Sequence, residues 1–209
     1  MSLFVTFEGI EGSGKSTHLR HLGARLRDGG HAVVETREPG DTAAGAAIRR
    51  LLLGTGNAAL TPVTELFLYC ADRSQHVQDV VRPALDASRI VLCDRFSDST
   101  IAYQGYGRGL DLDAVRSLDA LARGGVWPAL TFLFDCPVDE GLARARGRSG
   151  SADRFEREAP AFHERIRAGF LALAAAEPGR FRVLDARAPI ERVQARVIAE
   201  VERRLGAVR

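Results

Sequence analysis

The sequence predicts an α/β fold, in which a five-stranded parallel sheet carries helices on both faces. Five short apolar segments alternate along the chain with longer stretches of helical periodicity. Strands that are apolar throughout are typical of parallel sheets that helices cover on both sides. With 209 residues, 45% of them hydrophobic and 27% charged, the chain suits one domain over residues 1–209 with a core of useful size.

Turn and cap signals bound the expected elements. Gly29 and Gly30 stop the first helix, and Thr61 followed by Pro62 is an N-cap with proline at the first helical position. The glycines of Gly105–Gly109 predict a flexible loop. The expected strands are Leu3–Glu8, Ala32–Thr36, Ile90–Asp94, Leu130–Asp135 and Phe181–Leu184, and the expected helices are Ser16–Asp28, Ala43–Leu53, Thr61–Leu85, Ser97–Gln104, Leu112–Arg123, Val138–Arg146, Phe155–Ala176 and Ile190–Leu205.

A glycine-rich segment connects the first strand to the first helix and has the pattern G-x-x-x-x-G-K-[ST]. Its glycines let the backbone approach a polyphosphate, and successive N–H groups at a helix N-terminus bind anions. In this strand–loop–helix context the pattern predicts the three-layer sandwich of P-loop NTPases. The nucleotide-binding residues expected in the loop are Gly9, Ile10, Glu11, Gly12, Ser13, Gly14, Lys15, Ser16 and Thr17.

Lys15 is the only lysine in the chain, whereas the other 28 of the 29 basic residues are arginine. A compact ammonium fits between phosphate oxygens inside the loop, where a broad planar guanidinium would not. Lys15 is therefore expected to reach the terminal phosphates of a nucleoside triphosphate.

Composition argues against several classes of partner. A net charge of +2 is too small to indicate nucleic acid or a membrane surface, and no apolar run approaches the length of a membrane span. Cys70, Cys93 and Cys136 have no metal-ligand spacing, so we expect small buried residues in a reducing compartment. The five histidines show no such spacing either, and His18 and His21 are expected to be exposed. We expect a cytoplasmic protein that binds neither nucleic acid nor membranes.

An acidic residue, Asp94, ends the third strand after four apolar residues. Opposite a phosphate-binding loop this is the Walker-B arrangement, in which the carboxylate holds Mg²⁺ directly or through water. The Ser16 hydroxyl is expected to be a second protein oxygen on the ion. Arg95, the next residue, is expected to point at the transferring or accepting phosphate; the alternative is a surface ion pair.

An arginine-dense stretch, approximately residues 144–154, combines Arg144, Arg146 and Arg148 with glycine and serine before Arg154. Charge on a segment with hinges suits a mobile lid. Guanidinium groups match the charge that phosphoryl transfer spreads over three oxygens. Because the phosphate-binding loop contains no arginine, the lid is the expected source of that charge; the alternative is a solvated basic loop.

The loop alone permits a GTPase, a motor-type ATPase or a small-molecule kinase. A guanine-specific N-K-x-D motif is excluded because Lys15 is the sole lysine, and the L-S-G-G-Q signature of transporter ATPases is absent. The remaining pattern favours a small kinase.

Three further segments, Thr36–Gly40, Glu65–Arg73 and Asp94–Gly105, resemble in order and spacing the motifs of the thymidylate kinase (dTMP kinase) family. The third, D-R-[FY]-x-x-S-T-x-A-Y-Q-G, is highly specific, and the similarity covers nearly the whole chain. Arg144–Arg148 with Asp153–Glu156 resembles the bacterial subtype, which keeps its catalytic arginine in the lid.

The resemblance implies a Mg²⁺-dependent transfer from ATP to dTMP that gives dTDP and ADP, in dTTP biosynthesis, by a homodimer. It implies that Tyr69 stacks on thymine, that Arg73 one helical turn on reaches the base or phosphate, and that Arg95 holds the dTMP phosphate. The implied catalytic residues are Lys15, Arg95, Arg146 and Arg148; the metal site is Ser16 and Asp94; Arg144 joins the loop in binding ATP; and the substrate residues are Glu11, Arg37, Pro39, Tyr69, Arg73, Arg95, Ser99, Thr100, Tyr103 and Gln104.

Four positions depart from the commoner family pattern. Tyr69 stands where Phe is frequent, which preserves stacking. Asp41 replaces a second glycine, which places a carboxylate near the phosphate site, and Ala46 and Ala129 occupy positions that are often acidic. We expect only local effects.

Two rival functions remain at the level of sequence. A deoxynucleoside kinase would need a carboxylate base near a neutral hydroxyl acceptor, for which Glu8, Glu11 and Glu38 are candidates. A non-catalytic nucleotide-gated switch would use the same loop without an acceptor.

Overall fold

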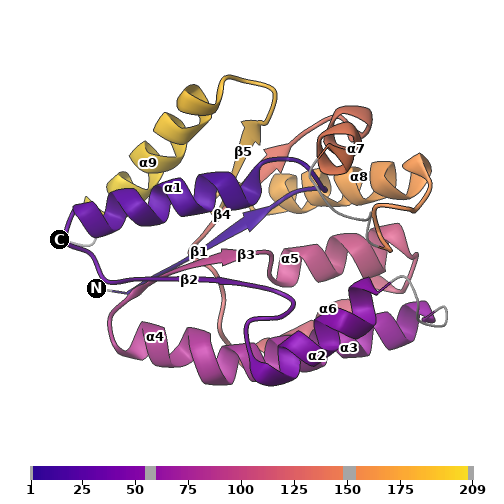
Figure 1. The fold of residues 1–209 in the computed structure, drawn as a ribbon. Helices are drawn as coiled ribbons and strands as arrows, with labels where there is room; N and C mark the ends of the chain where they lie inside the picture. The colour runs from indigo at the N-terminus through magenta and orange to yellow at the C-terminus, as the bar shows by residue number, and fades with distance from the viewer. Residues whose placement is uncertain (1, 55–59, 148–153, 207–209) are drawn as a thin grey trace.

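The computed structural model describes residues 2–54, 60–147 and 154–206. Its centre is one five-stranded sheet in which all neighbouring strands run parallel, in the order β2-β3-β1-β4-β5 (Figure 1). This confirms the predicted α/β class and the five predicted strands. The strands are β1 (Leu3–Glu8), β2 (Val33–Arg37), β3 (Ile90–Asp94), β4 (Leu130–Asp135) and β5 (Phe181–Asp185).

Helices fill the connections between the strands, as parallel pairing requires. The helices are α1 (Lys15–Asp28), α2 (Ala43–Leu53), α3 (Pro62–His76), the π-helical turn η1 (Val77–Val81), α4 (Arg82–Asp86), α5 (Ser97–Thr100), the π-helix η2 (Ile101–Gly107), α6 (Leu112–Arg123), α7 (Val138–Arg146), α8 (Pro160–Ala176) and α9 (Ile190–Gly206). In the described ranges, no helix is both long and apolar enough to cross a bilayer.

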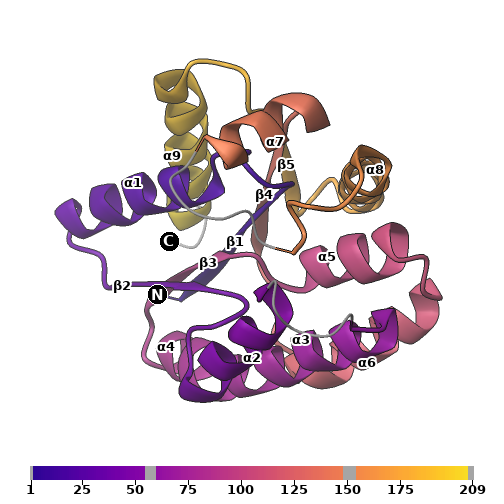
Figure 2. The ribbon, with the colours of Figure 1, turned by 45° about the vertical axis from the view of Figure 1, so that its right-hand side comes forward.

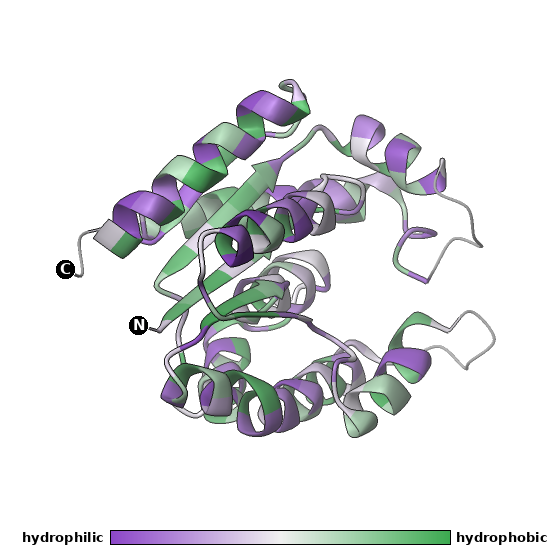
Figure 3. Ribbon diagram, turned by 60° about the vertical axis from the view of Figure 1, so that its left-hand side comes forward, coloured by the Kyte–Doolittle hydropathy of each residue, from purple (hydrophilic) through white to green (hydrophobic). Residues whose placement is uncertain are grey.

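The two faces of the sheet have separate cores. Along β1, Val5 and Phe7 point to one face, where they pack with leucines of α1 and valines of α9, and Phe4 points to the other, where it meets η1. Figure 1 shows α1 and α9 above the sheet and α3, α4 and α6 below it. In Figure 3 the strands are mostly apolar while the helices carry alternating apolar and polar stripes. The sheet is therefore the middle of three layers.

The carboxyl ends of the strands lie at one edge, where the connecting loops come together. Figure 2 shows α7 and α8 on the side of β4 and β5, away from β2. The helix α8 packs mainly against η2 and also touches β4 and β5. These elements leave an opening between the phosphate-binding loop and the α2–α3 layer.

The predicted flexible loop over Gly105–Gly109 is wrong. The helical segment begun by α5 continues as η2 to Gly107, and Gly105 and Gly107 are buried. A Cβ atom on Gly105 would lie 2.5 Å from Leu112, and one on Gly107 would lie 2.9 Å from Phe162. These glycines let α6 and α8 approach the backbone closely, which the local pattern does not distinguish from a loop.

Two predicted helices also differ in extent. The long helix expected over Thr61–Leu85 runs as α3, η1 and α4, with π-helical bonding in its middle. The helix expected from Phe155 begins only at Pro160, because residues 154–157 form turns. Proline at this first helical position is tolerated, since its missing N–H would have no partner there.

Candidate functional site

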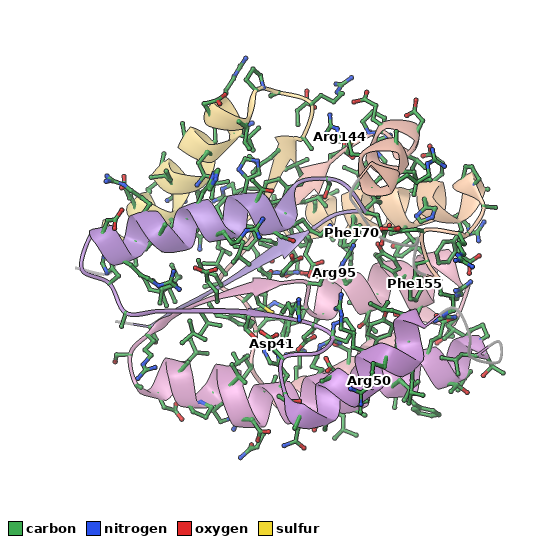
Figure 4. The ribbon with its side chains drawn as sticks, viewed as in Figure 1. Asp41, Arg50, Arg95, Arg144, Phe155 and Phe170 are labelled. Carbon is green, nitrogen blue, oxygen red and sulfur yellow. The ribbon has the colours of Figure 1, made fainter. Side chains whose placement is uncertain are left out.

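A cavity of about 670 Å³ lies at the carboxyl ends of β1, β2 and β3. Figure 4 shows Arg95, Asp41 and Phe155 around this opening, whereas Arg144 lies apart from it on α7. Ligands of open parallel sheets bind at this edge. Of the substrate and loop residues predicted from the sequence, the lining includes Glu11, Gly12, Gly14, Lys15, Ser16, Thr17, Arg37, Pro39, Tyr69, Arg73, Arg95, Ser99, Thr100, Tyr103 and Gln104.

The phosphate-binding loop has a backbone that only glycine fits at two points. Gly12 has φ of +69°, and a Cβ atom there would lie 2.0 Å from the carbonyl oxygen of Gly141. A Cβ atom on Gly9 would lie 2.5 Å from the carbonyl oxygen of Phe134. The loop is therefore closely packed against β4 and α7, which fixes the N–H groups at the start of α1.

Lys15 lies inside the loop. Its Nζ donates to the carbonyl oxygens of Gly9 at 3.0 Å and Ile10 at 2.7 Å. Burial, assisted by the positive charge of Arg95, lowers the pKa of Lys15 to about 8. Lys15 also donates to the Ser13 hydroxyl at 3.3 Å. A buried ammonium whose hydrogen-bond acceptors are all neutral gains much from an anionic partner.

Ser16 and Asp94 are brought together as predicted. The Ser16 hydroxyl donates a short hydrogen bond to Oδ2 of Asp94. Ser16 is exposed at the start of α1 and Asp94 is half-buried at the end of β3, so both oxygens face the cavity. Among the residues described, no group of three or more His, Cys, Asp or Glu side chains could hold a metal. One carboxylate and one hydroxyl fit Mg²⁺, which usually keeps waters and phosphate oxygens as its other ligands.

Arg95 bridges the phosphate-binding loop and the helix that follows β3. Its Nη1 donates to the carbonyl oxygen of Gly9 at 2.9 Å and to Oγ of Ser99 at 3.1 Å. Its Nη2 donates to Oε1 of Glu11 at 3.2 Å, and the guanidinium lies 5.0 Å above the ring of Tyr103. The cation therefore sits at the wall that the loop shares with the rest of the cavity.

Glu11 is the centre of a polar cluster. The Tyr103 hydroxyl donates to Oε1 of Glu11, and Nδ1 of His163 lies 3.3 Å from Oε2. Burial alone would raise the pKa of Glu11, but His163, Arg95, Lys15 and Tyr103 outweigh it and hold that pKa well below its usual range. The carboxyl is thus ionised where it faces the cavity. His163, for which we predicted no role, is fully buried on α8.

Three aromatic rings in the cavity lining pack against one another. Phe155 lies 6.4 Å from the ring of Tyr69 and 5.7 Å, edge to face, from the ring of Tyr103. Phe155 was not among the predicted site residues; its only signal is its place directly after the lid. Together the rings form an apolar part of the cavity lining, the aromatic patch, against which a planar base can pack.

Arg73 is more constrained than predicted. Its Nε donates to Oε2 of Glu38 at 2.9 Å, and its Nη1 donates to Oγ1 of Thr100 at 2.9 Å and to Asp119 at 2.6 Å. The side chain is 1% exposed. Two carboxylates hold the guanidinium, and Arg73 lines the cavity, so its contact with a base or phosphate stays a prediction.

The loop after β2 is fixed by carboxylates. Asp41 accepts from the Thr36 hydroxyl at 2.9 Å and from the backbone N–H of Arg37 at 3.1 Å, and it pairs with the Arg37 guanidinium. The backbone N–H of Gly40 donates to Asp72 at 3.0 Å. The unusual Asp41 therefore orders this loop beside the cavity, and partly neutralises Arg37.

The arginines of α7 point elsewhere. Arg144 donates to the carbonyl oxygen of Ala186 at 2.9 Å and to Glu140 at 3.3 Å, and Arg146 is exposed. Among the described residues, the cavity lining includes neither of them. The ATP contact of Arg144 and the catalytic role of Arg146 stay predictions. Arg148 lies outside the described residues.

The segment after the lid is anchored on the opposite side of the cavity. Arg154 donates to the carbonyl oxygen of Leu52 at 2.9 Å and to Oε1 of Glu65 at 2.7 Å. Glu65, which is 1% exposed, also accepts from Gln104 and pairs with Arg108. This cluster holds Phe155 in the aromatic patch.

None of the three carboxylates considered for a hydroxyl-activating base is free for that task. Glu38 pairs with Arg73 and His76, and Glu11 holds Arg95 and Tyr103. Glu8 is fully buried and bonded to the backbone of Phe96 and to Ser99. The geometry favours an acceptor that is already anionic.

Comparisons with known proteins identify the family. The family model described as "Thymidylate kinase" matches residues 7–197. A thymidylate kinase of Geobacter sulfurreducens is 52% identical over 206 residues, covering 96% of each chain, and one of Nitratidesulfovibrio vulgaris is 54% identical over 190 residues, covering 88% of each. The crystal structure of thymidylate kinase from Ehrlichia chaffeensis superimposes with a TM-score of 0.78 at 35% identity, covering 96% of this chain and 98% of that one. The chain therefore belongs to the thymidylate kinase family.

Proposed function

We propose that the cavity holds ATP at the phosphate-binding loop and dTMP between α3 and η2, and that the chain transfers the γ-phosphoryl group between them to give dTDP and ADP. This is the reaction of the family and a step towards dTTP. The observation that carries the proposal is the bond from Arg95 to the carbonyl of Gly9. It joins the acceptor-side arginine directly to the loop that binds the donor.

On the donor side, the N–H groups of the loop and the ammonium of Lys15 bind the phosphates of ATP. Ser16 and Asp94 hold Mg²⁺, which supplies charge neutralisation for the transferring group when it is bound. Their hydrogen-bonded oxygens at the cavity edge support this assignment.

On the acceptor side, Arg95 binds the phosphate of dTMP, and Tyr69 and Phe155 enclose the thymine ring. Glu11 and Tyr103 lie against the deoxyribose, where the close aromatic ring excludes a 2′-hydroxyl. Ser99, Thr100 and Gln104 line the base pocket, and Arg37 and Pro39 close it from the loop after β2. Each of these side chains lines the cavity.

The chemistry needs positioning and charge more than proton transfer, since a phosphate monoester is already anionic. Lys15 and Arg95 supply part of that charge. We propose that Arg148, with Arg146, supplies the rest from the lid over residues 144–154, and that Arg144 joins the ATP site, once the lid closes over bound nucleotide. Residues 1–209 act as one catalytic domain.

We also propose that the chain is a cytoplasmic homodimer. The neighbouring helices α2 and α3 carry Leu51, Val63 and Phe67, which are 48%, 46% and 55% exposed. Exposed apolar side chains gathered on adjacent helices are typical of interfaces. Light scattering of the wild type and of Phe67→Glu tests this: a dimeric mass that falls to the monomer in the variant supports it, and a monomeric wild type contradicts it.

Release of ADP, measured with dTMP, dUMP, dCMP and thymidine as separate acceptors, tests the proposed function. We expect the highest kcat/KM with dTMP. Turnover with thymidine but not dTMP would instead assign a deoxynucleoside kinase, and the absence of acceptor-dependent turnover would assign a nucleotide-gated switch.

A further inference from the structure

Glu8, the last residue of β1, is a carboxylate with no contact to the solvent. Its Oε1 accepts from the backbone N–H of Phe96 at 2.7 Å, and its Oε2 accepts from the Ser99 hydroxyl at 2.6 Å. Burying a carboxyl without a partner cation is unfavourable, and the burial together with Asp98 raises the pKa of Glu8 to about 8. A group in this position calls for an explanation.

Arg95, which directly precedes Phe96 in the chain, has a strained backbone. Its φ is +71°, and among the described residues only Ser88 is another non-glycine with positive φ. Such a conformation persists only where its surroundings hold it. Two backbone hydrogen bonds hold the turn. The N–H of Arg95 donates to the carbonyl oxygen of Phe7 at 3.1 Å, and the N–H of Phe96 donates to Glu8.

The side chain of Arg95 is held through the same carboxylate. The Ser99 hydroxyl donates to Glu8 and accepts from Nη1 of Arg95 at 3.1 Å. Glu8 therefore fixes both the backbone that follows Arg95 and the hydroxyl that its guanidinium binds. A second buried carboxylate lies nearby: Asp98 on α5, which pairs with Arg180.

We propose that Glu8 is a positioning residue for the acceptor phosphate: it touches neither nucleotide, and it holds Arg95 in the orientation that binds dTMP. This inference rests on the proposed role of Arg95. It predicts that changes at Glu8 act on dTMP rather than on ATP, although Glu8 directly precedes the ATP-binding loop.

Steady-state kinetics of Glu8→Ala, with separate KM values for the two substrates, tests the proposal. We expect the KM for dTMP to rise by about tenfold or more, as the loss of two buried hydrogen bonds implies, and the KM for ATP to change by less than about threefold. Glu8→Gln is the conservative rescue, since its amide oxygen still accepts from Phe96 N–H. We expect it to keep the dTMP KM within about threefold of wild type.

Two further variants separate positioning from general stability. Asp98→Asn removes a neighbouring buried charge, so it is expected to lower the unfolding midpoint without a selective rise in the dTMP KM. Glu8→Asp keeps the carboxyl group but is one methylene too short to hold both Phe96 and Ser99, so it is expected to raise the dTMP KM even if Glu8→Ala fails to fold. Adding Ser99→Ala to Glu8→Asp should then have less effect than Ser99→Ala alone, because the link is already broken.

Arg95→Ala distinguishes this inference from the proposed function beneath it. If Arg95→Ala raises the dTMP KM but the folded Glu8 variants leave it unchanged, or change both KM values equally, Glu8 does not position Arg95. If Arg95→Ala itself leaves the dTMP KM unchanged, the assignment of the acceptor site fails.

Discussion

The acceptor side of the cavity and the arginines of α7 are built in opposite ways. Arg73 on the acceptor side is 1% exposed and is bonded to two carboxylates, and Arg95 is bonded to the loop, to Ser99 and to Glu11. Arg144 and Arg146 are exposed, and neither lines the cavity. The proposed acceptor pocket is thus organised by the fold itself, whereas the charge proposed for the lid would have to be brought to the cavity. Selectivity and turnover should therefore respond to different residues.

Lys15→Ala should have the largest effect, because it removes a positive charge that phosphoryl transfer needs whichever arginines bind the acceptor and the transferring group. We expect kcat/KM to fall by about 10³-fold, measured by ADP release at varied ATP. The unfolding midpoint should stay close to wild type, because the hydrogen bonds of Lys15 are all to residues of its own loop. Arg25→Ala, which breaks an exposed pair with Glu202, is a matched control expected to leave kcat/KM unchanged. Near-normal activity of Lys15→Ala would refute its role.

The second prediction concerns the lid arginines. Arg148→Ala should lower kcat by about 10²-fold with little change in the dTMP KM, since it would act only on the transferring group. Arg144→Ala, whose guanidinium binds Glu140 and Ala186 here, serves as the comparison and should affect kcat less. If Arg144→Ala or Arg146→Ala gives the larger loss, the catalytic arginine has been assigned wrongly.

Phe155→Ala should break the acceptor side alone. Removing a ring that faces Tyr69 and Tyr103 should raise the dTMP KM by about tenfold and leave the ATP KM nearly unchanged. Phe155→Tyr keeps the ring and is expected to stay close to wild type. Equal changes in the two KM values would mean that Phe155 acts through the fold and not through the base.

The smallest expected effect is on pH dependence. The pKa of Lys15 is lowered to about 8, so in the free enzyme its ammonium loses the proton as the pH rises through that value. Because the protonated form binds phosphate, kcat/KM for ATP should fall several-fold between pH 7.5 and 9. A profile that stays flat to pH 9 would contradict the shifted lysine.

Much of this site could be predicted because its residues sit in short contiguous motifs. The loop, Ser16 with Asp94, and the residues from Arg95 to Gln104 are local patterns attached to strand ends, and parallel strands bring those ends together. Most of the strands are short apolar runs, and their length and their alternation with helical stretches distinguished them from buried helices.

The rest depended on contacts between distant segments. His18 was expected to be exposed, but it is buried, stacks on Phe134 and bonds to Gln194 of α9. Helical periodicity identifies a face without saying which element covers it. We missed the contact of His163 with Glu11, and the place of Phe155 in the aromatic patch, for the same reason.

The most direct test of the central claim, that Arg95 joins the acceptor phosphate to the donor loop, is the ratio of the dissociation constant of thymidine to that of dTMP, measured by calorimetry for wild type and Arg95→Ala. Thymidine lacks only the phosphate, so the ratio isolates what Arg95 binds. We predict a ratio far above one in the wild type that falls by about 10²-fold in the variant. A ratio unchanged by the substitution, or one that favours thymidine in the wild type, would contradict the account.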